Sequence, residues 1–260
     1  ARMLDLGLED KVAVITGGSD GLGRATAHRM AAEGAKVVIC ARREDYLQTV
    51  ASELTDETGG TVLGVQADVC KAADCEKLIE AAREAFGGVD ILVNNAGASA
   101  AAGFMDVTDE GWQADFDLKI MGAVRMCRGV IPMMQQRGGG AIVNATIGWG
   151  KAPGSAKLPT SLSRAAGINL TKSLSNEYAA DNIRVNTVCI GLIKSAQWTR
   201  RADGDAELAA LYDRMSEQVP LGRMGEAEEY GDLVAFLCSK RGAYITGTAI
   251  NLDGGMCPVV

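Results

Sequence analysis

The sequence of 260 residues contains a single histidine, His28, and no two cysteines in a Cys-x-x-Cys spacing. A zinc site needs several such ligands close together, so no metal site is predicted. The seven cysteines are scattered and odd in number, which is typical of reduced thiols rather than of a disulfide framework. We therefore expect a cytoplasmic protein whose cysteines are free.

Long apolar runs and basic clusters are also missing. No run reaches the roughly 18 apolar residues of a membrane span, and the first residues hold no apolar core of a secretory signal. The chain has 33 acidic against 26 basic residues and a net charge of −7, whereas nucleic-acid binding needs a basic face. We expect a small-molecule substrate and neither a nucleic acid nor a membrane as partner.

What the sequence does contain is an alternation of short apolar runs with helix-length amphipathic segments. The apolar runs are Val12–Ile15, Val37–Cys40, Val62–Val65, Ile91–Val93, Ala141–Val143, Arg184–Cys189 and Ala249–Leu252. The helical segments include Leu22–Ala32, Leu78–Phe86, Val124–Met134, Ala165–Tyr178 and Leu233–Leu237. Apolar runs without alternation are typical of strands buried on both faces, as in parallel sheets.

This alternation of strand and helix segments predicts one α/β domain over residues 1–260, with a doubly wound parallel sheet and helices on both faces. Residues 194–223 interrupt it with a polar, charged stretch. Long excursions of this kind are functional lids or surface insertions, so a substrate loop is predicted there.

A glycine-rich stretch, Thr16–Gly23 (TGGSDGLG), follows the first apolar run and opens the first helical segment. Glycine permits a tight turn and a close approach to a pyrophosphate, and the helix N-terminus offers unpaired N–H groups to phosphate. A dinucleotide-binding loop is therefore preferred over a purely structural turn. The predicted contacts come from Gly17, Ser19, Asp20, Gly21, Leu22 and Gly23.

The end of the second apolar run bears on the choice of dinucleotide. An NAD site places a carboxylate there for the ribose 2′-hydroxyl, whereas an arginine suits the 2′-phosphate of NADP. Here Ala41 is followed by Arg42 and Arg43. We predict NADP(H), with NAD(H) disfavoured; the alternative is that the two arginines only begin a solvated helix.

The glycine-rich stretch and Asn94–Gly97 (NNAG) together resemble the short-chain dehydrogenase/reductase family. The likeness runs from about Leu8 to Gly255 and includes Pro220–Gly225 and Thr246–Gly255. The resemblance implies a Rossmann-type sheet of seven strands and a homo-oligomer, either a tetramer or a dimer. It also implies cofactor contacts from Asp68, Val69, Asn95, Ala96, Gly97, Gly191 and Ile193.

Four side chains usually carry the chemistry of this family: asparagine, serine, tyrosine and lysine. The matching positions here hold Lys119, Ile147, Thr160 and Arg164. No tyrosine lies between residues 46 and 178, so no small shift of the alignment supplies the phenol. The cofactor half of the site thus looks intact, while the proton-transfer half looks rebuilt or absent.

Lys119 is the first candidate replacement. Burial could lower its pKa into the range of a general acid. The alternative is an ammonium that reaches solvent or pairs with Asp115 or Asp117.

Three further residues are catalytic candidates. Arg164 stays charged and can hydrogen-bond the nicotinamide ribose, as the usual lysine does. Thr160 lies four residues earlier on the same helix face and either orients substrate or water or simply packs. Thr146 could supply the hydroxyl that Ile147 lacks. Trp149 and Trp198 either line an apolar pocket or belong to the core.

Three functions stay open at this stage. The first is an NADP(H)-dependent oxidoreductase that acts on a carbonyl or a conjugated enone with a non-standard proton donor. The second is a non-redox lyase, isomerase or cyclase that keeps the fold, with Lys119 and Arg164 stabilising an enolate. The third is a catalytically silent NADP-binding subunit. The intact glycine-rich stretch does not separate them.

Overall fold

The computed structural model describes residues 5–195, 198 and 204–260, and its centre is one sheet of seven parallel strands. The strands are β1 (Val12–Thr16), β2 (Lys36–Ala41), β3 (Thr61–Gln66), β4 (Ile91–Asn94), β5 (Gly140–Ile147), β6 (Ile183–Ile190) and β7 (Ala249–Leu252). Their order is β3-β2-β1-β4-β5-β6-β7, with every pair parallel. The order reverses between β1 and β4, and ligands of such sheets bind at the carboxyl ends of the strands near this point.

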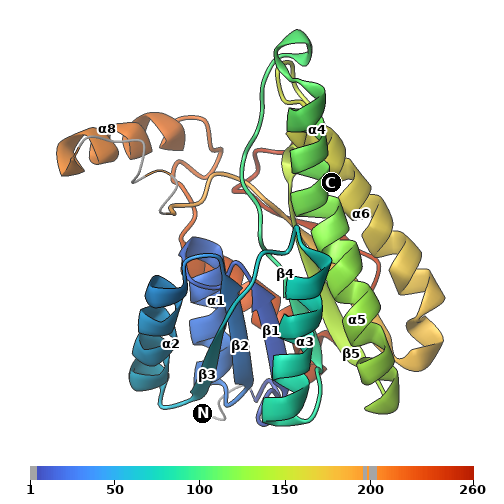
Figure 1. The fold of residues 1–260 in the computed structure, drawn as a ribbon. Helices are drawn as coiled ribbons and strands as arrows, with labels where there is room; N and C mark the ends of the chain where they lie inside the picture. The colour runs from blue at the N-terminus through green and yellow to red at the C-terminus, as the bar shows by residue number, and fades with distance from the viewer. Residues whose placement is uncertain (1–4, 196–197, 199–203) are drawn as a thin grey trace.

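Helices cover both faces of the sheet (Figure 1). One buried apolar cluster joins the sheet to α1 (Gly21–Ala32), α2 (Glu44–Thr58) and α9 (Ala227–Cys238). A second joins its other face to α3 (Ala72–Phe86), α5 (Gly122–Gln136) and α6 (Thr160–Glu177). The predicted doubly wound, Rossmann-type α/β fold is confirmed.

Burial along the strands explains why they lack alternation. All five residues of β1 are buried, because helices cover both faces at the centre of the sheet. The four residues of β7 are only partly buried, because this strand lies at the edge of the sheet. The carboxyl ends of the central strands therefore lie together at one end of the sheet, and buried apolar residues support them on both faces.

The connection from α4 (Asp109–Phe116) to α5 is a π-helical segment, Asp117–Met121. The sequence predicts a helical segment from Val124 onward and no element over residues 117–121. A π-helical turn adds one residue to the turn and rotates the side chains that follow, and such turns are frequent at functional sites. Lys119 lies in the middle of this segment and is buried.

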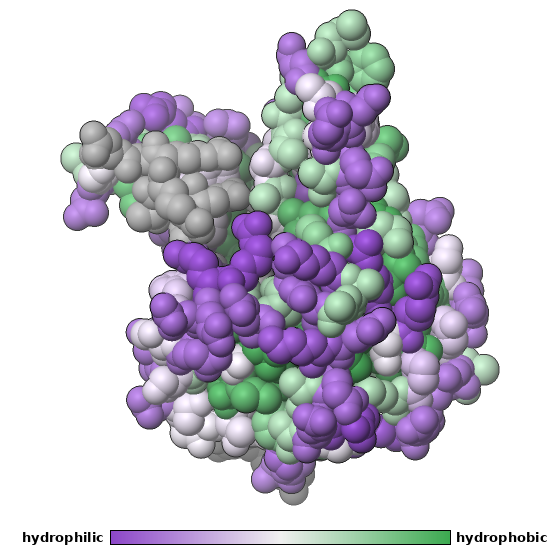
Figure 2. Space-filling model, viewed as in Figure 1, coloured by the Kyte–Doolittle hydropathy of each residue, from purple (hydrophilic) through white to green (hydrophobic). Residues whose placement is uncertain are grey.

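The segment predicted as a substrate loop leaves the body of the protein. Its helix α8 (Asp205–Ser216) stands apart from the sheet in Figure 1. Figure 2 shows the molecule hollowed between this projection and the one that carries α4. Residues 196–197 and 199–203 of the predicted loop lie outside the described residues. Among the helices that the structure describes, none has the length and apolar character needed to cross a membrane.

Candidate active site

A cavity of about 580 Å³ opens at the carboxyl ends of the strands. Ligand pockets commonly measure roughly 300 to 1,000 Å³. Most residues predicted to contact the cofactor or the substrate line this one cavity. They are Gly17, Asp20, Gly21, Leu22, Asn95, Ala96, Gly97, Thr160, Arg164, Gly191 and Ile193.

The glycine-rich stretch is folded tightly enough to require glycine. A Cβ on Gly23 would lie 2.1 Å from the carbonyl oxygen of Gly17, which no side chain can tolerate. Gly17 itself has φ +66°, and its Cβ would come within 3.1 Å of the Ala96 Cα. Asn95 Nδ2 holds the turn by donating to the Thr16 and Gly17 carbonyls at 3.1 and 3.2 Å.

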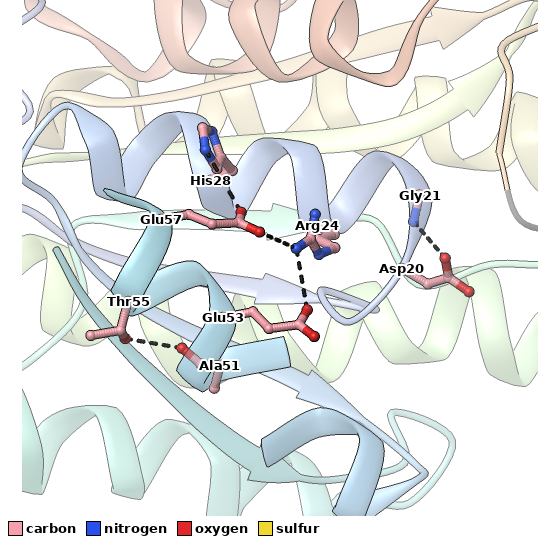
Figure 3. A network of polar contacts seen from close by, with 8 residues as sticks. All are labelled: Asp20, Gly21, Arg24, His28, Ala51, Glu53, Thr55 and Glu57. Carbon is pink, nitrogen blue, oxygen red and sulfur yellow. Dashed lines mark hydrogen bonds and ion pairs between the residues drawn. The ribbon is translucent and has the colours of Figure 1, made fainter. Parts of the chain in front are cut away.

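The start of α1 lies directly beside this turn. Asp20 is its N-cap and accepts a hydrogen bond from the Gly21 N–H at 2.9 Å, as Figure 3 shows. Arg24 in the first turn pairs with Glu53 and Glu57 of α2, which ties the two helices together (Figure 3). The bare backbone of the turn and the helix N-terminus beside it fit the pyrophosphate of a dinucleotide.

Six of the predicted cofactor contacts do not line the cavity. They are Ser19, Gly23, Arg42, Arg43, Asp68 and Val69. Arg42 and Arg43 are exposed after β2, and the Arg43 guanidinium lies 4.4 Å from the centre of the Tyr46 ring. Val69 is buried, and Asp68 accepts a hydrogen bond from the Cys70 N–H at 3.0 Å. Both arginines thus remain accessible to a phosphate at the end of β2.

A buried polar network lies behind the wall of the cavity. Lys119 Nζ forms an ion pair with Asp115, and both side chains are only 1% exposed. The same Nζ donates to Thr160 Oγ1 at 2.9 Å. Ser163 Oγ donates to the other Asp115 oxygen at 2.6 Å. The network links α4, the π-helical segment and the first turn of α6.

Thr160 is the member of this network that reaches the cavity. Its Oγ1 also accepts from the Ala100 N–H at 3.0 Å. A hydroxyl has two acceptor sites and one proton to donate. Since Lys119 and Ala100 use both acceptor sites, the Thr160 proton remains available for donation.

Burial lowers the pKa of Lys119, although the hydrogen bond to Asp115 opposes the shift. The positive charge of Arg164 lowers this pKa further. A lysine so placed gives up a proton more readily than one in water. The Lys119 ammonium thus pairs with Asp115, as one of the predicted alternatives has it, and it does not reach solvent.

Arg164 lies between the network and the cofactor end of the cavity. Its Nη1 donates to the Ala145 carbonyl at 2.6 Å, and a Cβ on Gly97 would lie 2.7 Å from its Nη2. The Nε atom is buried and has no hydrogen-bond partner among the described residues. Burial lowers the pKa of the guanidinium, yet arginine keeps its charge in proteins. Arg164 can therefore donate to hydroxyl oxygens that enter the cavity beside Gly97.

Thr146 points elsewhere. Its Oγ1 lies 3.2 Å from the Cys189 Sγ, and the residue lines a small inner cavity of about 20 Å³ together with Lys119 and Arg164. Ile147 instead lines the large cavity. The Thr146 hydroxyl is thus not presented where the missing serine would be, and its catalytic role stays a prediction.

Two members of the network were not among the predicted site residues. The sequence predicts Asp115 only as one of two alternative partners of Lys119, and it predicts no role for Ser163. The spacings were visible, since Asp115 precedes Lys119 by four residues and Ser163 follows Thr160 by three. The C-terminal residues Met256, Cys257 and Pro258, which also line the cavity, carried no signal.

The chain is similar to known proteins along almost its whole length. A family model described as enoyl-(acyl carrier protein) reductase matches residues 17–257. Dehydrogenase/reductase SDR family member 4 of Homo sapiens is 38% identical over 251 residues, which cover 95% of this chain and 88% of that protein.

Two solved structures share the fold over nearly the full length. L-sorbose reductase from Gluconobacter frateurii, complexed with NADPH and L-sorbose, has a TM-score of 0.94 and 38% identity, covering 99% of this chain and 100% of the other. An NADPH-bound short-chain oxidoreductase from Pseudomonas aeruginosa PAO1 that contains an atypical catalytic center has a TM-score of 0.91 and 34% identity, covering 96% and 98%. The family model and these relatives extend along almost the whole chain, which therefore belongs to the short-chain dehydrogenase/reductase family.

Proposed function

We propose that the protein is an NADPH-dependent reductase of a carbonyl or conjugated enone substrate, with Thr160 as the group that donates the proton. One observation carries this proposal: Thr160 lines the cavity while Lys119 Nζ donates to its hydroxyl oxygen. Membership of an oxidoreductase family and the NADPH in two similar structures support the reaction class and the cofactor.

The residues at the cavity fit NADPH, which when bound supplies a hydride to the substrate carbon. The turn at Gly17 and the N-terminus of α1, which line the cavity, would hold the pyrophosphate. Arg42 and Arg43 would recognise the 2′-phosphate, and Arg164 would donate to the nicotinamide ribose. The other proposed contacts are Ser19, Asp68, Val69, Asn95, Ala96, Gly191 and Ile193.

Proton transfer starts at Thr160. An aliphatic hydroxyl is much less acidic than a phenol, so it needs help that a tyrosine would not. The Lys119 ammonium supplies this help, because it donates to Thr160 Oγ1 and compensates the charge that builds there. As the substrate oxygen becomes negative, Thr160 passes it a proton and Lys119 passes one to Oγ1. Lys119 ends neutral, and after the product leaves Thr160 passes its proton back to Lys119 while it takes one from water in the cavity.

The enone case uses the same residues differently. Hydride addition to the β-carbon leaves negative charge on the enolate oxygen, which the Thr160 hydroxyl and Lys119 stabilise. The proton on carbon can then come from water. This second substrate class is favoured by the weak acidity of threonine, since no strong acid has to protonate the oxygen.

A titration with NADPH and NADH, followed by a carbonyl and enone panel, tests the proposal. We expect NADPH to bind more tightly and its absorbance to fall with at least one substrate. Arg42→Ala and Arg43→Ala should each weaken NADPH binding about tenfold and leave NADH binding unchanged. Arg83→Ala on α3, whose partner is the exposed Glu80, is the matched control and should change neither.

Two other results would redirect the proposal. NADPH that binds and is never oxidised favours a non-redox enzyme or a silent subunit. Failure of both nucleotides to bind contradicts the proposal outright. The family resemblance also supports a homo-oligomer, a tetramer or dimer, and the scattered cysteines support a cytoplasmic location. Light scattering after gel filtration would measure the mass of the oligomer.

A further inference from the structure

Two short segments that are distant in the sequence contribute walls to the large cavity. The turn wall is residues 147–152 at the end of β5, and the C-terminal wall is residues 256–258 after β7. The two walls touch at one corner, where a Cβ on Gly148 would lie 3.3 Å from the Cβ of Cys257. The width of the cavity beside this corner therefore depends on how firmly the two walls are held together.

The turn wall is a compact unit. Its residues Gly148–Gly150 form a single 3₁₀ turn that carries Trp149. The Gly148 carbonyl accepts from the backbone N–H groups of Lys151 and Ala152 at 2.9 and 3.0 Å. Because Lys151 directly follows the turn and is bonded to it, a bond made by its side chain also holds Trp149 in place.

The Lys151 side chain joins the turn wall to the edge strand β7. Its Nζ donates to the Ala249 carbonyl and to Asn251 Oδ1, each at 2.6 Å. Both acceptors belong to β7, and both bonds are partly buried. Hydrogen bonds from an ammonium are stronger than those between neutral groups, so this is a firm attachment.

Asn251 carries the attachment on to the C-terminal wall. Its Nδ2 donates to the Val259 carbonyl at 2.8 Å, and Val259 directly follows the wall. Lys151 can only donate and a backbone carbonyl can only accept, so the orientation of the Asn251 amide is determined. A continuous chain of hydrogen bonds thus runs from Lys151 through Asn251 to Val259, and we call it the clamp.

The other bonds of the C-terminal wall do less to join it to the turn wall. The Asp253 oxygens accept from the Gly255 and Cys257 N–H groups at 2.9 and 2.7 Å, which shapes the segment from within. Cys257 Sγ donates to the Gly148 carbonyl at 3.7 Å, and a thiol is a weak donor. Of the two links described between the walls, the clamp is therefore the stronger.

We propose that Lys151 and Asn251 are positioning residues that hold the two walls together and thereby limit the size of the substrate. With the clamp intact, a substrate whose carbonyl lies at Thr160 meets a fixed wall at Cys257 and its neighbours. With the clamp broken, the C-terminal wall can move outward and admit a longer molecule. The inference rests on the proposed function, because it places the reactive oxygen at Thr160.

Two ketones that differ in length test the clamp: a methyl ketone with a short alkyl chain, and the same ketone extended by a phenyl ring. Lys151→Met keeps the length of the side chain and removes the ammonium. With saturating NADPH, we expect the ratio of kcat/KM for the long ketone to that for the short one to rise about tenfold. The kcat for the short ketone and the Kd of NADPH should stay unchanged. Lys151→Arg keeps a donor and should restore the ratio.

The matched control for Lys151→Met is Lys77→Met on α3. Lys77 Nζ also donates to a backbone carbonyl, that of Gln66, but it lies outside the cavity. This change should leave the ratio as it is. An equal rise in both variants, or no rise in Lys151→Met, overturns the proposal.

The second half of the clamp is tested at Asn251. Asn251→Asp keeps an oxygen for Lys151 and sets another oxygen against the Val259 carbonyl, so that bond is lost. We expect the same rise in the ratio as for Lys151→Met. Asn182→Asp is the matched control, because Asn182 Nδ2 donates to the Gly138 carbonyl away from the cavity. An unchanged ratio in Asn251→Asp contradicts the clamp.

Hydrogen exchange and binding separate this inference from the proposed function. Lys151→Met should speed the exchange of the Gly255 and Cys257 amides about tenfold, whereas Lys77→Met should not. If neither ketone oxidises NADPH, the reductase proposal fails, and the ratio of their Kd values for the complex with NADP⁺ replaces that of kcat/KM; a tenfold change in Lys151→Met supports the clamp. Faster exchange with an unchanged ratio means a purely structural role and overturns it. Reduction of both ketones with neither exchange nor ratio altered leaves the reductase standing and the clamp refuted.

Discussion

Two buried carboxylates, each paired with a cation, lie near opposite ends of the parallel strands. Asp90 directly precedes β4 at the amino ends of the strands. It accepts from Arg137 Nε and Nη2 at 3.0 and 2.8 Å and from the Val12 N–H at 2.9 Å. Asp115 lies at the other edge, with Lys119 and Ser163 as partners. The difference lies in the cations: Arg137 is 33% exposed, whereas the Lys119 side chain is 1% exposed.

This difference in exposure has opposite consequences for proton affinity. Arg137 keeps contact with water, and its hydrogen bonds to Asp90 raise the pKa of its guanidinium. Burial instead lowers the pKa of Lys119, because Asp115 does not fully replace the lost water. A pair whose cation stays hydrated stabilises the fold, while a pair whose cation is desolvated can release a proton. We expect the first pair to matter for stability and the second for turnover.

Replacing Thr160 should show the largest difference between the two ion pairs. Lys119 donates to the Thr160 hydroxyl beside the cavity, whereas the side-chain hydrogen bonds described for Arg137 go to Asp90. Thr160→Val keeps the shape of the side chain and removes the hydroxyl. We expect kcat to fall roughly 10²- to 10⁴-fold with NADPH affinity unchanged. Thr160→Ser keeps the hydroxyl and should retain most of the activity. Equal activities of the valine and serine variants would exclude Thr160 as the donor.

Asp115→Asn removes the charge that opposes the deprotonation of Lys119. The reaction needs the protonated ammonium, so activity falls as the pH rises through the pKa of Lys119. Without the carboxylate this pKa falls further, and the basic limb of the pH profile of kcat moves to lower pH. We expect a loss of the order of tenfold on that limb. The groups to consider there are Asp115 on α4 and Arg164 on α6, and only the first is changed.

The matched control for this experiment is the same change at the other edge of the sheet. Asp90→Asn should leave the pH profile of kcat in place. A shift of equal size in both variants would mean that the profile reports general destabilisation and not the charge of Lys119.

Asp90→Asn should lower the free energy of unfolding. Burial alone would raise the pKa of Asp90, but the Arg137 and Val12 hydrogen bonds hold it below its ordinary value. A carboxylate with a lowered pKa stabilises the fold above its unfolded pKa, and this stabilisation is lost as the pH falls through the folded pKa. Since Arg137 is partly hydrated, we expect a cost of about 2 kcal/mol at pH 7. Urea unfolding at pH 7 and near pH 3 should show the difference shrinking in acid.

The sequence predicted the fold well, because the central strands are buried on both faces and lack alternation. The predicted run Ala249–Leu252 coincides with β7. The start of α9 was missed, since its first turn is polar and is held by the capping box of Glu226 and Glu229 rather than by apolar spacing. The π-helical segment was also missed, because apolar periodicity over one turn does not distinguish it from ordinary helix.

The candidate site was predictable only as a set of positions. The replacement of all four usual side chains could be read from spacing alone. The partner of Lys119 could not, because Asp115 and Asp117 both lie within one turn of it and only the local geometry selects Asp115. The loop that places the Ala100 N–H on Thr160 is a contact across 60 residues, for which the sequence has no signal.

The smallest expected effect on the pH profile of kcat comes from Ser163→Ala, and the direction of the shift makes it informative. Ser163 donates to the Asp115 oxygen that Lys119 does not use, so it withdraws negative charge from the carboxylate. Without it Asp115 holds Lys119 more strongly, the pKa of Lys119 rises, and the basic limb of kcat moves to higher pH. This shift is opposite to that of Asp115→Asn. The lost hydrogen bond should cost about 1 kcal/mol of stability.

Ser161→Ala is the matched control for this last change, because Ser161 is buried on the same turn of α6 and its loss should leave the limb in place. A limb that moves to lower pH in Ser163→Ala would contradict the charge argument. It would mean that Ser163 holds Asp115 in the orientation that contacts Lys119, and that the pair depends on geometry more than on the charge left on the carboxylate. Measuring both serine variants across the basic limb therefore decides which property sets the proton affinity of Lys119.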